Sequence, residues 1–129
     1  MEDISEENLL SNALDNFTLD NYETALNQIN SILNKFPSSP KKSDYLLYRS
    51  IIQSKQGKYE EALKDLDEIE KDSNNIKEYT YYLTRGKVLY YLGKFEDSKK
   101  VLNIGLESNK NNENIFNPWI KKVEDELKQ

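Results

Sequence analysis

The sequence contains no cysteine and no histidine. It therefore has no disulfide, no thiol nucleophile, no imidazole base and few of the usual ligands for zinc or haem. Only four glycines occur, and none of them forms a glycine-rich phosphate loop. No apolar run approaches the ~20 residues that span a bilayer. These absences predict no metal, no cofactor and no membrane insertion, and they argue against an enzyme.

An excess of positive charge is also lacking. The net charge of the 129 residues is −5, so nothing in the overall balance favours a nucleic-acid partner. The chain starts with Met1-Glu2-Asp3, which is unlike the basic start of a signal peptide, so we expect a cytoplasmic protein. Charged residues make up 32% and hydrophobic residues 36%. Because the hydrophobic residues are periodic, this balance indicates a folded, elongated domain rather than disorder.

What the sequence does contain is a repeat. An aromatic residue recurs at Tyr22, Tyr59 and Phe95, in steps of 37 and 36 residues. Small residues stand nine positions before each aromatic residue and three positions after it. The small residues are Ala13, Ser50 and Gly86 before it and Ala25, Ala62 and Ser98 after it. This spacing predicts pairs of antiparallel helices that cross closely at the small residues, and such pairs must stack to bury their apolar stripes.

Turn and cap residues divide the repeat into helices. Gly57 and Gly93 can supply the positive φ that ends the first helix of a pair. Asp20 with Glu23 matches a capping box, and both Ser39-Pro40 and Asn117-Pro118 resemble helix starts. The helices are expected at about 6–18, 21–35, 40–56, 59–72, 75–92, 95–108 and 117–128. The last has an apolar face of Trp119, Ile120, Val123 and Leu127, which suits a capping helix, and we expect Trp119 to pack on the last repeat.

These landmarks resemble the tetratricopeptide repeat (TPR) family, whose repeat has 34 residues. The resemblance implies an all-α fold, a right-handed superhelical stack of antiparallel helix pairs with about seven helices. It also implies a single TPR domain over residues 1–129. Its parts would be repeats at about 6–39, 43–76 and 79–112 and the capping helix at about 117–128.

The resemblance further implies a concave groove lined by the first helix of each pair. Such a groove suits an extended or helical peptide of another protein. The residues that it places in the groove are Leu14, Tyr48, Ile51, Lys55, Thr84, Lys87 and Tyr91. Tyrosine is frequent, with nine in the chain, and five of them crowd the first helix of the third repeat. One helix cannot bury five tyrosines, so some must be exposed, packed on the preceding repeat or used in binding.

The third repeat contains Tyr82-Leu83-Thr84-Arg85-Gly86-Lys87 and then Leu92-Gly93-Lys94-Phe95-Glu96-Asp97-Ser98. These segments closely resemble the TPR domains of Hsp70 and Hsp90 co-chaperones. Those domains grip the C-terminal carboxylate of the chaperone with a clamp of Lys, Asn and Arg side chains. The clamp positions here are occupied by Leu10, Leu14, Tyr48, Thr80 and Thr84. A buried carboxylate without cations is costly, so binding of a chaperone tail by that route is disfavoured. The nearest cations, Arg49, Arg85 and Lys87, either form a different anion site or pair with acidic residues of flanking helices.

Three functions compete on this basis. The leading hypothesis is a scaffold or adaptor that binds a peptide or helix of a partner in its groove. The alternative is a structural subunit of a larger complex, or a self-associating component, that uses exposed tyrosines or the terminal helix. An enzyme is disfavoured because acidic pairs such as Glu60/Glu61 lie where helix N-termini favour acids anyway.

Overall fold

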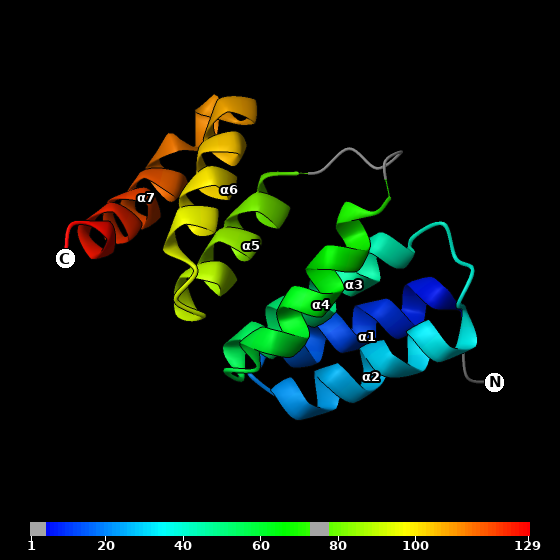
Figure 1. Ribbon diagram of the computed structural model, residues 1–129. Coiled ribbons are helices and arrows are strands. Elements are labelled where there is room, and N and C mark those ends of the chain that lie inside the picture. Colours follow the sequence, from blue (N-terminus) through cyan, green and yellow to red (C-terminus); the bar gives the residue numbers. More distant parts are fainter. Residues whose placement is uncertain (1–4, 73–77) are drawn as a thin grey trace. The chain divides into compact units, whose positions relative to one another are not determined.

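The computed structural model describes residues 5–72 and 78–129, which form seven α-helices and one short 3-10 helix (Figure 1). The helices are α1 (Glu6–Thr18), α2 (Tyr22–Lys35), α3 (Lys42–Lys55), α4 (Tyr59–Glu70), α5 (Tyr79–Tyr91), α6 (Phe95–Ser108), η1 (Lys110–Asn112) and α7 (Glu113–Leu127). No β-strand occurs in these two ranges. None of the helices described combines the length and the apolar character needed to cross a bilayer. The expected all-α class with about seven helices is confirmed.

The chain divides into two compact units, an N-terminal unit of Met1–Asp72 and a C-terminal unit of Ser73–Gln129. In the N-terminal unit, α1 pairs with α2 and α3 with α4, and α2 packs on α3 (Figure 1). Its core consists of Ala13, Ala25, Leu26, Ile29, Ile32, Tyr45 and Ile52. Ala13 and Ala25 are fully buried, which fits their predicted role at the crossing of the first pair.

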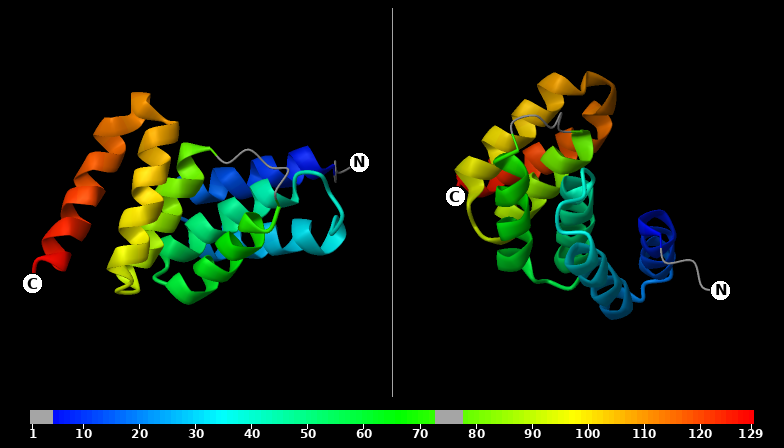
Figure 2. Two further views of the ribbon diagram at one scale, coloured as in Figure 1. Left: turned by 45° about the horizontal axis from the view of Figure 1, so that its top comes forward. Right: turned by 90° about the vertical axis from the view of Figure 1, so that its right-hand side faces the viewer.

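In the C-terminal unit, α5 pairs with α6, and α7 lies along α6 (Figure 2). Leu102, Phe116 and Val123 form its core. A Cβ atom on Gly86 would lie 2.3 Å from Leu102 Cδ2, so only glycine lets α5 approach α6 this closely. The buried Ser98 hydroxyl donates a hydrogen bond to the Gly86 carbonyl oxygen at 2.7 Å. The small residues of the third repeat therefore stand at a close helix crossing, as predicted.

The turn within each helix pair contains one residue with a positive φ angle. Gly57 and Gly93 both have φ of +77°, and Asp20 has φ of +63° at the equivalent position before α2. The predicted capping box at Asp20 is therefore wrong: α2 is preceded by Asn21 as N-cap, without a side-chain cap. Instead of bonding a backbone N–H, the Asp20 carboxylate accepts a hydrogen bond from the Tyr22 hydroxyl at 2.9 Å. Asp20 thus fills the left-handed position that glycine fills in the other two pairs.

Two other helix starts lie later than predicted. Helix α3 begins at Lys42 rather than Pro40, because the Lys42 N–H bonds the Ser39 carbonyl oxygen in a tight turn. The Ser39 hydroxyl accepts from the Lys41 N–H within this turn. Helix α5 begins at Tyr79, with Glu78 as an extended N-cap. The earlier residues of its predicted span, 75–77, lie outside the described residues.

The capping helix begins earlier than predicted, at Glu113, and Pro118 lies inside it. Its first turns hold Phe116, which is fully buried. Gly105 of α6 leaves the room for this ring, since a Cβ there would lie 2.6 Å from Phe116 Cε1. The fully buried Phe116 ring anchors this first part of the helix on α6, ahead of Pro118. The segment between the predicted helices at 95–108 and 117–128 therefore forms η1 and the beginning of α7.

Candidate functional site

The predicted groove residues of the N-terminal unit lie on its first helices. Tyr48, Ile51 and Lys55 follow one another on α3 at spacings of three and four residues, which places them on one face of the helix. Tyr48 and Ile51 are half-buried and Lys55 is exposed, while Leu14 of α1 is half-buried. Tyr48 also packs against the core of this unit. This face therefore offers aromatic, aliphatic and cationic side chains.

The first helices of this unit are tied together at their N-terminal ends. The buried Tyr45 hydroxyl of α3 donates a hydrogen bond to Glu6 Oε1 of α1 at 2.8 Å. Hydrogen bonds from Ser39 and Tyr45 hold the pKa of the Glu6 carboxyl below its usual value. Burial, together with the bond to Glu6, raises the pKa of Tyr45. This contact fixes α1 against α3 and so positions the faces that carry Leu14 and Tyr48.

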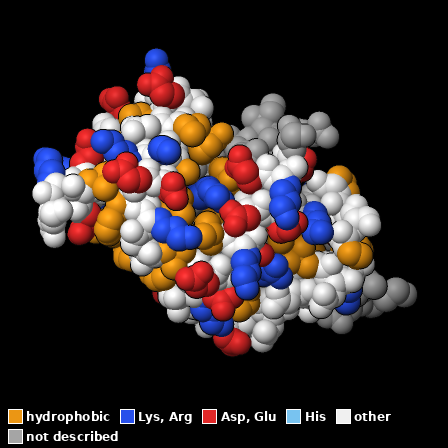
Figure 3. Space-filling view, in the orientation of Figure 1, with side chains coloured by type: hydrophobic (Ala, Val, Ile, Leu, Met, Phe, Trp, Pro, Cys, Tyr) orange, Lys and Arg blue, Asp and Glu red, His pale blue; other side chains and the backbone are white. Residues whose placement is uncertain are grey.

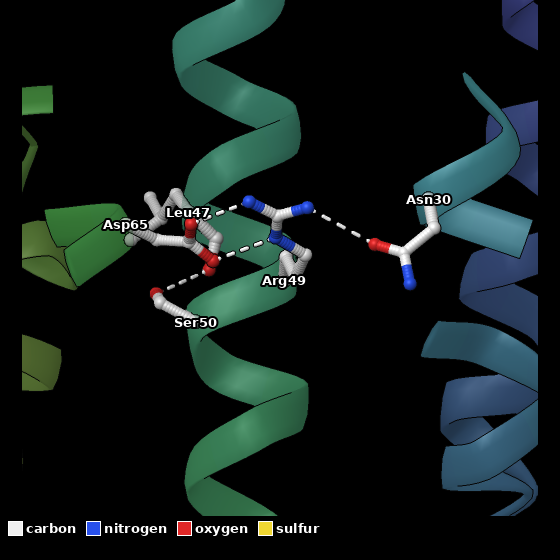
Figure 4. A network of polar contacts seen from close by, with 5 residues as sticks. All are labelled: Asn30, Leu47, Arg49, Ser50 and Asp65. Carbon is white, nitrogen blue, oxygen red and sulfur yellow. Dashed lines mark hydrogen bonds and ion pairs between the residues drawn. The ribbon is translucent and has the colours of Figure 1, made fainter. Parts of the chain in front are cut away.

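Arg49 is engaged by neighbouring helices rather than offered to a ligand (Figure 4). Its Nε and Nη2 donate to the two carboxylate oxygens of Asp65 on α4, at 2.8 and 2.6 Å. Its Nη1 donates to Asn30 Oδ1 on α2 at 3.0 Å. The bond to Asp65 raises the pKa of Arg49. Of the two interpretations from sequence, the ion pair with a flanking helix is the one found for Arg49.

The predicted groove residues of the C-terminal unit lie on α5 at the same spacing. Thr84 is only 8% exposed, Lys87 is half-buried and Tyr91 is 51% exposed. Lys87 and Tyr91 both reach α7. The Lys87 Nζ lies 5.2 Å from the centroid of the Trp119 ring, and the Tyr91 and Trp119 centroids lie 5.9 Å apart. The structure thus brings two predicted residues together around the single tryptophan.

Trp119 has further aromatic and cationic neighbours. Its ring meets the Tyr90 ring edge to face at 5.7 Å, a favoured arrangement for aromatic pairs. The Lys122 Nζ lies 4.6 Å from the Trp119 centroid. Trp119 also packs against the core of Leu102, Phe116 and Val123, which confirms its predicted contact with the last repeat. Sequence reasoning did not place Trp119 or Lys122 among the groove residues, although their spacing of three put both on one helix face.

The seven predicted groove residues fall in the two units, four in the first and three in the second. Their union in one groove stays a prediction. Within residues 5–72 and 78–129, no cluster of three or more carboxylates could hold a metal ion. The chemistry that these faces offer is apolar and aromatic contact with lysine at the margin.

Comparison with protein-family models finds no match, and no curated protein matches the sequence. Solved structures do match. The TPR domain of Sgt2 from Aspergillus fumigatus is 16% identical, with a TM-score of 0.81 over 98% of this chain and 81% of that one. The first TPR of Spaghetti (RPAP3), bound to the HSP90 peptide SRMEEVD, is 18% identical, with a TM-score of 0.84 over 100% and 98% of the two chains.

The second TPR domain of human RPAP3, in complex with the HSP70 peptide SGPTIEEVD, is 21% identical. Its TM-score is 0.76, and the match covers 94% of this chain and 93% of that chain. Similarity at these identities shows a common fold. The resemblance drawn from the sequence is therefore confirmed at the level of the fold.

Proposed function

We propose, from the premise that this chain has the all-α fold of tetratricopeptide repeat proteins, that it is a scaffold which binds a peptide or helix of another protein. Within each unit, the helix faces that carry the predicted groove residues would contact the peptide: those of α1 and α3 in the N-terminal unit and that of α5 in the C-terminal unit. The observation that carries the proposal is the matching register on α3 and α5. In both helices a lysine and a tyrosine lie on one face, beside Ile51 in α3 and Thr84 in α5.

The character of these side chains supports peptide binding. Tyrosine offers a large contact area with few rotors, and aromatic side chains dominate the energy of many interfaces. Figure 3 shows hydrophobic side chains at the surface of the molecule among basic and acidic ones. Structures with the same fold, such as the first TPR of Spaghetti, hold peptides of partner proteins.

The mode of binding would differ from a carboxylate clamp. Leucine, tyrosine and threonine stand at the five positions where co-chaperone domains place their clamp. Arg49, the cation nearest to Tyr48 in sequence, is held by Asp65. We therefore propose contacts along the length of a peptide instead of a grip on its terminal carboxylate.

Selection from a displayed library of random linear peptides, with the purified chain as bait, tests this function. Enriched peptides should lose affinity on Lys55→Glu, which changes an exposed residue of the α3 face. The matched control is Lys64→Glu, an exposed lysine on the second helix of the same pair. Enrichment of peptides that bind both variants equally well would contradict the groove assignment. No enrichment at all would contradict peptide binding.

Self-association is a second candidate, because Tyr79 and Tyr91 of α5 and Ile104 of α6 expose large side chains. Such side chains could serve a fixed contact in a complex or with a second copy. Sedimentation at several concentrations distinguishes a contact with a second copy of this chain from a contact with another protein. A mass that rises with concentration, and that falls again on Ile104→Lys, supports self-association.

A further inference from the structure

We propose that Ser39 is a phosphorylation site for a serine kinase that selects proline at the next position, and that its phosphate separates the first turn of α1 from α3. The inference goes beyond the proposed function, because it concerns a covalent modification and needs no bound partner. It starts from the motif Ser39-Pro40-Lys41-Lys42, which lies in the turn before α3 except for Lys42, the first residue of that helix.

This motif has the features that such a kinase needs. The three prolines of the chain follow Phe36, Ser39 and Asn117, so Ser39 is the only serine or threonine that precedes a proline. Pro40 favours an extended Ser39 and removes the N–H at the next position, and a kinase pocket without an acceptor for that hydrogen selects such a residue. Lys42, three positions after Ser39, adds a positive charge of the kind that kinases use to choose substrates.

The turn is accessible to a kinase. Of residues 37–42, Ser39 is half-buried and the other five are exposed. The turn also borders an open depression of about 390 Å³ that Pro40, Leu46 and Lys71 help to line. In the transfer, the bond from the γ-phosphorus of ATP to the oxygen that it shares with the β-phosphate breaks, and a bond from the γ-phosphorus to Ser39 Oγ forms. The hydroxyl proton passes to a carboxylate of the kinase, and ADP leaves.

Ser39 lies where this turn meets the N-terminal end of α1. Its Oγ accepts a hydrogen bond from the Lys41 N–H at 3.1 Å, and its hydroxyl is hydrogen-bonded to the Glu6 carboxylate of α1. Glu6 also accepts from the buried Tyr45 hydroxyl of α3 at 2.8 Å. The next residue of α1, Glu7, has its Oε1 3.9 Å from Lys41 Nζ. Two acidic residues of α1 are therefore held by the turn and by α3.

A phosphate on Ser39 changes each of these contacts. It removes the hydroxyl hydrogen that serves Glu6, and it adds a charge of about −1.5 to −2 at pH 7 beside two carboxylates. Repulsion then acts on both Glu6 and Glu7. The phosphate also competes with Glu7 for Lys41, because it carries the larger negative charge. All of these changes weaken the hold of the turn on α1.

The opposing effects are smaller. The phosphate gains attraction from Lys41 and Lys42 and lies near the positive N-terminal end of α3. Both lysines are exposed, and exposed ion pairs contribute little to stability. The contact between Glu6 and Tyr45 is partly buried, where charges are screened less by salt. The first turn of α1 therefore leaves α3, while the fully buried Ala13 keeps the rest of α1 packed on α2.

The site is tested by incubating the purified chain with ATP and a proline-directed kinase of the cyclin-dependent class, and by locating the phosphate with mass spectrometry. Ser39 should be modified, and Ser39→Ala should abolish that modification. Pro40→Ala should lower its rate by about tenfold. The matched control is Ser38→Ala, which removes the adjacent exposed serine and should leave the rate unchanged.

Urea unfolding measures the effect of the phosphate on α1. Phosphorylation should lower the midpoint by roughly 0.5 M, the shift expected when about one hydrogen bond to a charged group is lost. In Glu6→Gln the same phosphate should lower the midpoint by less than about half as much, because the repelling carboxylate is gone. Glu60→Gln, which removes an acidic residue from the first turn of α4, should keep the full effect. Circular dichroism verifies that each variant is folded.

Three results overturn the inference. A chain without phosphate on Ser39 after this treatment refutes the site itself. A phosphorylated chain whose midpoint is unchanged or raised refutes the separation of α1 from α3, and so does an equal fall in Glu6→Gln. None of these measurements involves a peptide, so they leave the proposed function to its own test.

Discussion

The contact between Arg49 and Asp65 allows a quantitative prediction for the N-terminal unit. The Asp65 side chain is 6% exposed and accepts two hydrogen bonds from the guanidinium group, at 2.6 and 2.8 Å. Arg49 also binds Asn30, so one side chain on α3 connects α2 with α4 (Figure 4). Arg49→Met removes the cation, keeps most of the apolar stem and leaves the Asp65 carboxylate buried.

The expected loss of unfolding free energy follows from the 6% exposure of the Asp65 side chain. Removing one partner of a buried ion pair costs about 3–5 kcal/mol, because the remaining charge loses its compensation. The Arg49 side chain is 26% exposed, which admits some water to the site, so we expect the lower end, about 3 kcal/mol. Replacing both partners by apolar residues, Arg49→Met with Asp65→Leu, should recover stability to within about 1 kcal/mol of the wild type.

Urea unfolding followed by circular dichroism measures these changes. With a slope of about 1.5–3 kcal/mol per molar urea, Arg49→Met should lower the midpoint by about 1–2 M. Lys55→Met is the control, since it removes an exposed cation from the same helix and should cost less than about 0.5 kcal/mol. A loss below about 1 kcal/mol for Arg49→Met, or a double variant less stable than either single variant, would refute the reasoning.

Three further predictions concern stability. Gly86→Ala should destabilise the chain by about 1–3 kcal/mol in urea unfolding, because its Cβ would overlap Leu102, and a neutral effect would contradict that close crossing. Asp20→Gly should raise the unfolding free energy by roughly 0.5 kcal/mol, since glycine adopts the positive φ of this position without strain. A lower unfolding free energy would show that the hydrogen bond of the Asp20 carboxylate outweighs the relief of strain. Because the Glu6 pKa is lowered from 4.5, its contribution is present above that pH and lost as pH falls through the folded-state value. Tyr45→Phe should therefore flatten the acid limb of the stability profile, and an unchanged limb would argue against the contact.

The outcome of the sequence predictions depended on how local each signal was. Helices α1 and α6 begin and end where the sequence predicted, and Ser5 caps α1 by accepting from the Asn8 N–H at 3.2 Å. These boundaries are set by caps and turns within a few residues. The predicted start of α7 at Pro118 is wrong, because Phe116 is buried against α6 and the helix begins before the proline, at Glu113.

The candidate site shows the same division. Lys87 and Tyr91 could be named from the repeat register, because residues at fixed offsets from Gly86 share one face of α5. Their contact with Trp119 could not be predicted, since it depends on how α7 is rotated about its own axis. That rotation is set by the packing of the Phe116 ring of α7 against Gly105 of α6.

The repeat at Tyr22, Tyr59 and Phe95 thus determined the all-α class and the helix pairs, and it predicts which helix faces would meet a ligand. It could do so because periodicity and turn chemistry act over one or two helical turns. Only the tertiary structure decided that Arg49 pairs with Asp65 and that Lys87 meets Trp119. Both pairings join residues from different helices, and side-chain packing selects among partners that the sequence leaves equally possible.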